Sequence, residues 1–223
     1  MSAIQVSAFR WVPPFAQGLV RDLRVRWALG EAGLDYDEQL IDREDQKTEA
    51  YRRLQPFGQV PALVEGDQVL FESGAIVLHL ADRSPALMPE AAAEREQVRS
   101  WSFAALNTIE PPISMLVTID LQPEADRRAT ARLRETIVQR IEGRLDALAA
   151  FLGERAHLVG DRFSAADLLM TTVLRILRTT DLVTRRPALD AYRQRFEARP
   201  AFKAALAAQL RAFEANAPAG PGP

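Results

Sequence analysis

Two short segments hold the residues whose types and spacing are best suited to chemistry. Val60-Pro61 opens an apolar run, and proline, which cannot donate to a strand ladder, belongs at the first residue or the edge of a strand. The amide and carbonyl of Val60 then lack a continuing partner strand, and a cis Val60–Pro61 bond would turn both groups toward a ligand. Glu72-Ser73 stands before an apolar helical pattern, where free N–H groups and the positive dipole end attract a carboxylate. Together the two segments suit a small peptide-like anion.

Each segment also has a purely structural interpretation. Proline commonly begins a strand, and only about one X-Pro bond in twenty is cis in folded proteins. Serine at a helix start is commonly an N-cap, so Ser73 at or near that position needs no ligand to explain it. The occurrence of both segments close together in the sequence favours the ligand site.

A hairpin and a helix are the elements that position these segments. Residues 60–64 and 69–72 are short apolar, β-branched runs, and residues 65–68 between them have the composition of a hairpin turn. A helix is predicted over residues 72–81, with a buried face formed by Ile76, Val77 and Leu80.

The chain resembles the glutathione-binding half of the glutathione S-transferase family in the motifs Gly58-Gln-Val-Pro-Ala-Leu63 and Glu72-Ser-Gly-Ala-Ile76. The resemblance implies that Val60, before a cis Pro61, pairs its backbone with the cysteinyl part of glutathione. It also implies that Glu72 and Ser73 hold the γ-glutamyl end. Gln59 matches the position of a lysine that is frequent in the family, and it could bond the glycyl carboxylate without supplying a charge.

The resemblance extends to both flanks and covers nearly the whole chain. Upstream, apolar residues at helical spacing predict a helix packed on two sides, with Gly33 as its C-cap. Downstream, Ser164 and Asp167 have the spacing of a capping box that leads into the apolar run 168–177. This motif resembles the N-capping motif of the family's core helix, which implies a role in folding.

The order of elements predicts an α/β thioredoxin-like domain followed by an all-α domain, which is the glutathione S-transferase fold. Strands are predicted at 4–9 and 36–41 and a short helix at 47–54, in addition to the elements above. One long helix carries an apolar stripe from Leu133 to Leu152, and Glu110-Pro-Pro is expected to kink or break another helix. The predicted boundaries are 1–82 for the first domain, 83–89 for the linker, 90–216 for the helical domain and 217–223 for a disordered tail.

Composition narrows the function classes. A formal charge of -2 and a pI near 5.8 give no general attraction to nucleic acid or acidic membranes. Without a membrane-length apolar stretch or a leader at Met1, we expect a soluble cytoplasmic protein. The absence of cysteine excludes disulfides, glutaredoxin-type dithiol chemistry and the cysteine-dependent branches of the family. No nucleotide-binding or metal-binding motif occurs, so neither nucleotides nor metals are implied, and His79 and His157 are interpreted as structural. Glutathione is the co-substrate that the resemblance implies.

The group that would ionise the glutathione thiol is not evident. A free thiol with a pKa near ~8.5 is mostly protonated at neutral pH, so a hydrogen bond or a dipole must stabilise the thiolate. Family members usually place Tyr, Ser or Cys after the first strand, but residues 9–21 contain none of these. Counting from the strand puts Trp11 or Val12 at the expected place, and counting back from the helix puts Leu19 or Val20 there. This loop is therefore longer than usual.

Three side chains in the loop could stabilise a thiolate. Arg21 would supply a positive charge, Gln17 an amide donor and Trp11 an indole N–H, while the backbone N–H groups around Gly18 could act without them.

Simpler explanations exist for these residues. Arg21 and Arg24 have the pattern of ordinary helix-surface charges, and Trp11 and Phe15 that of a pocket wall. We favour the wall for both aromatic residues.

The resemblance implies an enzyme of detoxification, a homodimer, that conjugates glutathione to a small hydrophobic electrophile or uses it to reduce a peroxide. The second substrate is expected between the first loop and the helices around Trp101 to Met115. Two other classes stay open. One is a non-catalytic binding or interaction module, favoured by the missing Tyr, Ser or Cys. The other is a glutathione-dependent isomerase or dehalogenase, which only substrate trials would distinguish from the transferase.

Overall fold

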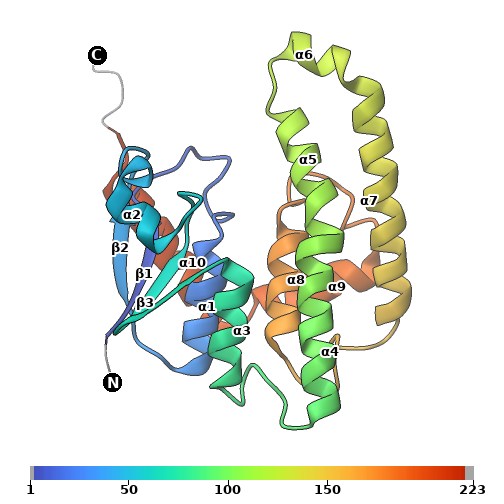
Figure 1. Ribbon diagram of the computed structural model, residues 1–223. Coiled ribbons are helices and arrows are strands. Elements are labelled where there is room, and N and C mark those ends of the chain that lie inside the picture. Colours follow the sequence, from blue (N-terminus) through green and yellow to red (C-terminus); the bar gives the residue numbers. More distant parts are fainter. Residues whose placement is uncertain (1–2, 219–223) are drawn as a thin grey trace. The chain divides into compact units, whose positions relative to one another are not determined.

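The computed structural model describes residues 3–218, which form two compact units (Figure 1). The first unit contains the residues up to Met88 together with those from Ala198 onward, and the second is Pro89–Glu197. The sequence-based division into 1–82, 83–89 and 90–216 stays a prediction, but contacts group the last helix, α10 (Pro200–Ala215), with the first unit. Of the tail expected to be disordered, residues 219–223 lie outside the described part of the chain.

The first unit is built on a mixed four-stranded sheet of order β2-β1-β3-β4. The central strand β1 (Ile4–Phe9) pairs parallel with β2 (Asp37–Ile41) and antiparallel with β3 (Ala62–Glu65), which forms a hairpin with β4 (Gln68–Phe71). The helical elements of the unit, besides α10, are α1 (Asp22–Ala32), the 3-10 turn η1 (Asp45–Lys47), α2 (Glu49–Leu54) and α3 (Ser73–Asp82). This order confirms the predicted thioredoxin-like α/β domain.

Helix α1 is packed on two sides, as its sequence predicts. It contacts α3 and α10, and Trp27 packs edge-on against Phe202 of α10 with ring centroids 4.9 Å apart. Arg199, just before α10, makes a two-pronged ion pair with Glu31 at 2.6 and 2.7 Å. Gly33 ends the helix in the left-handed conformation, at φ 67°, and is the predicted C-cap. The N-terminal part of the first unit is thus tied to α10.

The second unit is helical in its described elements. Its helices are α4 (Ala92–Phe103), the π-helical turn η2 (Ala104–Ile109), α5 (Glu110–Asp120), α6 (Glu124–Ala129), α7 (Ala131–Leu152), α8 (Ala165–Arg175) and α9 (Pro187–Glu197). Buried α8 begins with the predicted capping box, in which Asp167 accepts from the Ser164 N–H at 3.0 Å. Tyr192 of α9 donates to the same carboxylate at 2.8 Å. The predicted all-α domain and its cap are confirmed.

The Glu110-Pro-Pro segment, where a kink or break was expected, follows a π turn and continues as helix without a break. Helix α5 follows directly from the π turn η2, which widens the backbone just before the prolines. Pro112 has no N–H for the Thr108 carbonyl four residues earlier, and the Arg144 guanidinium of α7 donates to that carbonyl instead. A side chain from a neighbouring helix therefore replaces the backbone donor that proline removes.

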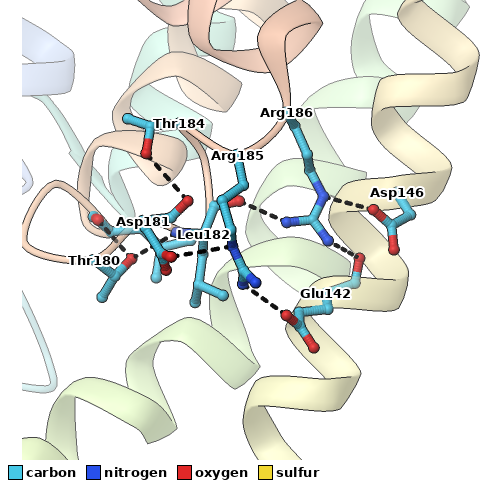
Figure 2. Close-up of polar contacts among 9 residues, drawn as sticks. Glu142, Asp146, Thr180, Asp181, Leu182, Thr184, Arg185 and Arg186 are labelled. Carbon is cyan, nitrogen blue, oxygen red and sulfur yellow. Dashed lines mark hydrogen bonds and ion pairs between the residues drawn. The ribbon is translucent and has the colours of Figure 1, made fainter.

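Two consecutive arginines fasten the connection between α8 and α9 to α7 (Figure 2). Arg186 Nε lies 2.6 Å from Asp146 Oδ1, and its Nη2 donates to the Glu142 carbonyl at 3.2 Å. Arg185 pairs with the Glu142 carboxylate at 2.7 Å and with Asp181 at 3.3 Å. These residues satisfy one another, so we interpret the cluster as a structural fastening.

The predicted apolar stripe of α7 is buried from Ile137 to Leu152, but Leu133 at its start is 49% exposed.

No helix in the described part of the chain is long and apolar enough to cross a membrane.

Candidate functional site

Strand register brings the two candidate segments together. Ala62, the first residue of β3, pairs with Phe71, the last residue of β4. Val60-Pro61 immediately precedes that pair on one strand, and Glu72-Ser73 immediately follows it on the other. Both segments therefore lie at the same edge of the sheet. We call Gln59, Val60, Pro61, Glu72 and Ser73 the edge site.

The Val60–Pro61 peptide bond is cis. The Val60 side chain is buried in a small core with Ile41 and Tyr51, and Pro61 is buried as well. Gln59, one residue earlier, is exposed, so its amide side chain faces solvent. The segment thus combines an anchored side chain at Val60 with an accessible amide at Gln59.

Glu72 adopts an unusual backbone conformation at the start of α3. Its φ of 68° and ψ of 114° lie in a region that non-glycine residues seldom occupy, and such residues cluster at functional sites. Glu72 stands at the N-cap position, makes no side-chain cap hydrogen bond, and its side chain is exposed. The carboxylate of Glu72 is therefore not used to cap the helix.

Ser73 is the first residue of α3 and is buried. Its Oγ accepts a hydrogen bond from Arg24 Nη1 of α1 at 3.2 Å. A hydroxyl that accepts from a guanidinium keeps its own O–H to donate. The simple N-cap interpretation of Ser73 therefore does not describe this residue, because the cap position belongs to Glu72 and the hydroxyl bonds a buried arginine.

Sequence reasoning missed Arg24, which it treated as a surface charge. Arg24 is buried, because α1 packs against α3 and α10 on two sides. The signal available was the two-sided apolar pattern itself, which leaves a charged residue in the middle of α1 little access to solvent. Arg24 therefore places a buried guanidinium donor beside Ser73 at the start of α3.

The turn before the edge site is held by close backbone packing. Gly58 has φ 64°, and a Cβ at that position would lie 2.8 Å from the Gln46 carbonyl oxygen. Gln46 Nε2 in turn donates to the Gly58 carbonyl, and the Gly58 N–H donates to Gln55 O at 2.9 Å. Only glycine fits this approach, so the turn that delivers Gln59 and Val60 is rigidly specified.

The long loop between β1 and α1 contains the three side chains considered for thiolate stabilisation. Arg21 is the N-cap residue of α1 and is exposed. Gln17 donates its amide to the Val12 carbonyl at 3.1 Å, so part of its donor capacity serves the loop itself. Trp11 is half-buried. The structure therefore places the Arg21 guanidinium at the start of α1, and the Gln17 amide already donates a hydrogen bond within the loop.

A cavity of about 680 Å³ lies against this loop, within the first unit. Its lining includes the aromatic side chains of Trp11 and Phe15, and Arg10, Asp42 and Arg43 add charges of both signs. Phe15 is 57% exposed. The cavity is large enough for a small hydrophobic molecule.

The other two expected pocket residues belong to the second unit. The ring of Trp101 on α4 packs against Phe151 of α7 with centroids 4.4 Å apart, and it is half-buried. Met115 on α5 is 46% exposed. Trp101 thus contributes to the packing of its own unit, and Met115 offers an accessible apolar side chain.

Titratable groups add no metal site. Among residues 3–218, no group of three or more His, Cys, Asp or Glu side chains is placed to hold a metal ion. Asp167 accepts hydrogen bonds within its capping box, and its burial raises its pKa. His157 packs against the ring of Phe196.

Comparisons with known proteins identify relatives over the whole length. Residues 17–82 match the glutathione S-transferase N-terminal domain, and residues 109–200 match the glutathione S-transferase C-terminal domain. Glutathione S-transferase 4 of Zea mays is 31% identical over 98% of both chains, and glutathione S-transferase 3 of Zea mays is 32% identical over 83% of this chain and 88% of its own. The solved glutathione transferase of Burkholderia graminis, with two glutathione molecules bound per subunit, superimposes with a TM-score of 0.81 at 26% identity, covering 92% of this chain and 88% of its own.

Proposed function

Because the chain belongs to the glutathione S-transferase family, we propose that it is a glutathione transferase that binds glutathione at the edge site. The observation that carries the proposal is the buried Ser73 hydroxyl, held by Arg24 at the start of α3. A γ-glutamyl carboxylate would accept from this hydroxyl and from free N–H groups of the helix start, close to a buried cation.

The remaining parts of the edge site suit the rest of the tripeptide. The backbone of Val60 is assigned to the cysteinyl unit, since the Val60 side chain is buried and its backbone precedes Pro61, which has no N–H. The exposed Gln59 amide is assigned to the glycyl carboxylate. Glu72, exposed and outside the helix cap, is assigned to the γ-glutamyl ammonium group.

The reaction is attack of the glutathione thiolate on an electrophile. A bond forms between sulfur and the electrophilic carbon, the leaving group departs with its electron pair, and the thiol proton passes to solvent. Arg21 at the start of α1 is our first assignment for thiolate stabilisation, because Gln17 already donates to Val12. The indole of Trp11 remains the second assignment.

The acceptor is proposed to be small and hydrophobic. The cavity beside the β1–α1 loop, walled by Trp11 and Phe15, supports this choice. Reduction of a hydroperoxide by the same thiolate is a further proposal, in which two glutathione molecules become glutathione disulfide while the peroxide becomes an alcohol and water. We propose a role in detoxification for either reaction, and the cytoplasmic location stays a prediction.

A non-catalytic binding module is the second candidate function. It is favoured by one observation, namely that the loop from Arg10 to Arg21 contains no Tyr, Ser or Cys. Such a module would bind glutathione without accelerating its reactions.

We also propose a homodimer. Phe57 is 66% exposed and packs edge-on against Phe71 of β4, with ring centroids 6.3 Å apart. Val69, on the same strand as Phe71, is also exposed. Exposed aromatic side chains of this kind are typical of interfaces. Sedimentation of the unaltered protein and of Phe57→Ser tests the proposal, because a dimer that uses this patch should dissociate in the variant.

The activity assay combines the purified protein, reduced glutathione and an activated aryl halide, with product formation followed by absorbance and mass. A glutathione-dependent rate well above the uncatalysed one supports the transferase. A parallel assay with an organic hydroperoxide, coupled to detection of glutathione disulfide, tests reduction. Glutathione binding without acceleration of either reaction would favour the non-catalytic module.

A further inference from the structure

Two buried hydroxyls, Ser7 on β1 and Tyr51 on α2, lie beneath the edge site. Ser7 Oγ and Tyr51 Oη are 2.8 Å apart. Tyr51 Oη lies 2.6 Å from the Gln59 carbonyl oxygen, and the Ala62 N–H donates to Ser7 Oγ at 2.7 Å. The hydroxyl pair therefore contacts the chain on both sides of Val60-Pro61. We call this pair and its three hydrogen bonds the Ser7–Tyr51 bridge.

Donor and acceptor chemistry gives every bond of the bridge a direction. A carbonyl oxygen only accepts, so Tyr51 must donate its single proton to Gln59. Ser7 must then donate to Tyr51, and its lone pair accepts from Ala62. The bridge thus runs from the Ala62 N–H through both hydroxyls to the Gln59 carbonyl, with both hydroxyl protons committed. Burial raises the pKa of Tyr51, which keeps its hydroxyl a donor at neutral pH.

The bridge begins where regular strand pairing ends. The β1–β3 ladder pairs Ile4 with Glu65, and its last pair is Val6 with Leu63. The next N–H along β3, that of Ala62, bonds the Ser7 side chain instead of the backbone of β1. The strand was predicted from residue 60 but begins at Ala62, directly after Pro61, which has no N–H to donate to a ladder.

Tyr51 holds the segment in a second way, through its ring. Tyr51 packs with Val60 and Ile41 in a small core, while its hydroxyl bonds the residue before Val60. Ring and hydroxyl together restrain the Val60 side chain and the preceding carbonyl. The Val60 backbone, which the proposed function assigns to glutathione, is the part left to a ligand.

We propose that Ser7 and Tyr51 are positioning residues that hold the Val60 backbone in the geometry that receives the cysteinyl unit of glutathione. This inference rests on the proposed function. It adds residues that do not touch the ligand and that lie 44 positions apart in the sequence. When the binding segment is already ordered, binding does not have to supply the free energy of ordering it. Loss of the bridge should therefore weaken glutathione binding.

The test uses Tyr51→Phe, which removes one hydroxyl and keeps the ring in its core. We expect its Kd for reduced glutathione, measured by calorimetry, to rise about three- to tenfold, the usual effect of one hydrogen bond. The KM for glutathione should rise by the same factor, whereas kcat at saturating glutathione and the KM for the electrophile should stay unchanged. A merely structural role would not produce this selective change.

Tyr36→Phe is the matched control. Its hydroxyl accepts from Arg26 Nη1 at 3.3 Å in the same unit and has no part in the bridge. The control should bind glutathione as the unaltered protein does. Ser7→Ala should resemble Tyr51→Phe, and the double variant should bind about as weakly as either single one, because each substitution breaks the same bridge.

Three outcomes would overturn the inference or its premise. Unaltered glutathione affinity in a folded Tyr51→Phe overturns it, even if thermal stability falls. Equal weakening by Tyr36→Phe overturns it as well, since the effect would then be unspecific. Absence of glutathione binding by the unaltered protein overturns the proposed function and the ligand assigned here. Hydrogen exchange of the Val60 and Ala62 amides, expected to quicken in Tyr51→Phe, shows separately whether the bridge orders the segment.

Discussion

Arg24 Nη1 lies 3.2 Å from Ser73 Oγ and joins the middle of α1 to the first residue of α3. The two residues are 49 positions apart, and both are buried. The contact orients the serine lone pair toward the arginine and leaves the O–H for a ligand. In the proposed function, this contact suits the start of α3 to the γ-glutamyl carboxylate of glutathione.

The first prediction concerns Ser73→Ala. We expect it to weaken glutathione binding by roughly 1 to 3 kcal/mol, because a ligand carboxylate would lose its donor and Arg24 its acceptor. Calorimetric titration measures the change. Ser84→Ala, at a buried serine of the same unit whose Oγ accepts from the Ala86 N–H, is the control and should bind normally. Unchanged affinity with lowered thermal stability in Ser73→Ala would assign Ser73 to folding alone.

A second prediction addresses thiolate stabilisation. Removal of the charge in Arg21→Met should raise the pKa of the bound glutathione thiol by roughly half to one unit, an effect limited by the exposure of Arg21. Ultraviolet absorbance of the thiolate against pH measures it. Gln17→Leu should have a smaller effect, since Gln17 already donates to Val12.

Arg53→Met provides the control for charge, since Arg53 is exposed on α2 and pairs with Glu49. A thiol pKa equal in Arg21→Met and the unaltered protein would shift the assignment to Trp11 or to the backbone N–H groups around Gly18.

A third prediction separates steric fit from backbone conformation in the turn before the edge site. Gly58→Ala should lower the free energy of unfolding by about 2 kcal/mol or more, because φ is positive and the new Cβ meets the Gln46 carbonyl. Gly33→Ala has a similar φ but meets no described heavy atom within 4 Å, so we expect a loss of only about 1 kcal/mol. Urea unfolding measures both. Equal losses of unfolding free energy in the two variants would show that the contact of the new Cβ with Gln46 does not destabilise the fold.

Alkaline pH supplies a fourth prediction. Burial raises the pKa of all three tyrosines, Tyr36, Tyr51 and Tyr192. Above the ordinary tyrosine pKa of about 10, the unfolded chain loses these protons first, so the free energy of unfolding should fall as pH rises, by up to about 1.4 kcal/mol per pH unit for each tyrosine.

Below that pH the contribution of the tyrosines should be constant. Absorbance at the tyrosinate band should titrate later in the native protein than in urea. Coincident titration curves would contradict the burial of the hydroxyls.

Local patterns in the sequence predicted much of the fold. The strand at 4–9, the C-cap Gly33 and the Ser164 capping box depend on neighbouring residues, and each is found at the predicted position. The site segments were predicted because their chemistry lies in short motifs. Their adjacency then follows from the pairing of Ala62 with Phe71.

Long-range polar contacts could not be predicted from the sequence, because no local pattern of residues indicates them. Arg24 had the pattern of a surface charge, and nothing near Ser7 in the sequence indicates that its hydroxyl bonds Tyr51, 44 positions away. Glu110-Pro-Pro predicted a kink or break but not the contact by which Arg144, distant in sequence, donates to the Thr108 carbonyl. Such contacts depend on the packing of elements and therefore required the structure.

The most direct test of the account is calorimetric titration of the unaltered protein with reduced glutathione at neutral pH, beside the dipeptide Cys-Gly, which lacks the γ-glutamyl unit. The account predicts micromolar to low-millimolar binding of glutathione and much weaker binding of the dipeptide, because Ser73 and Glu72 would lose the carboxylate and the ammonium group of the γ-glutamyl unit. No heat of binding with glutathione, or equal affinity for both ligands, would contradict the assignment of the edge site.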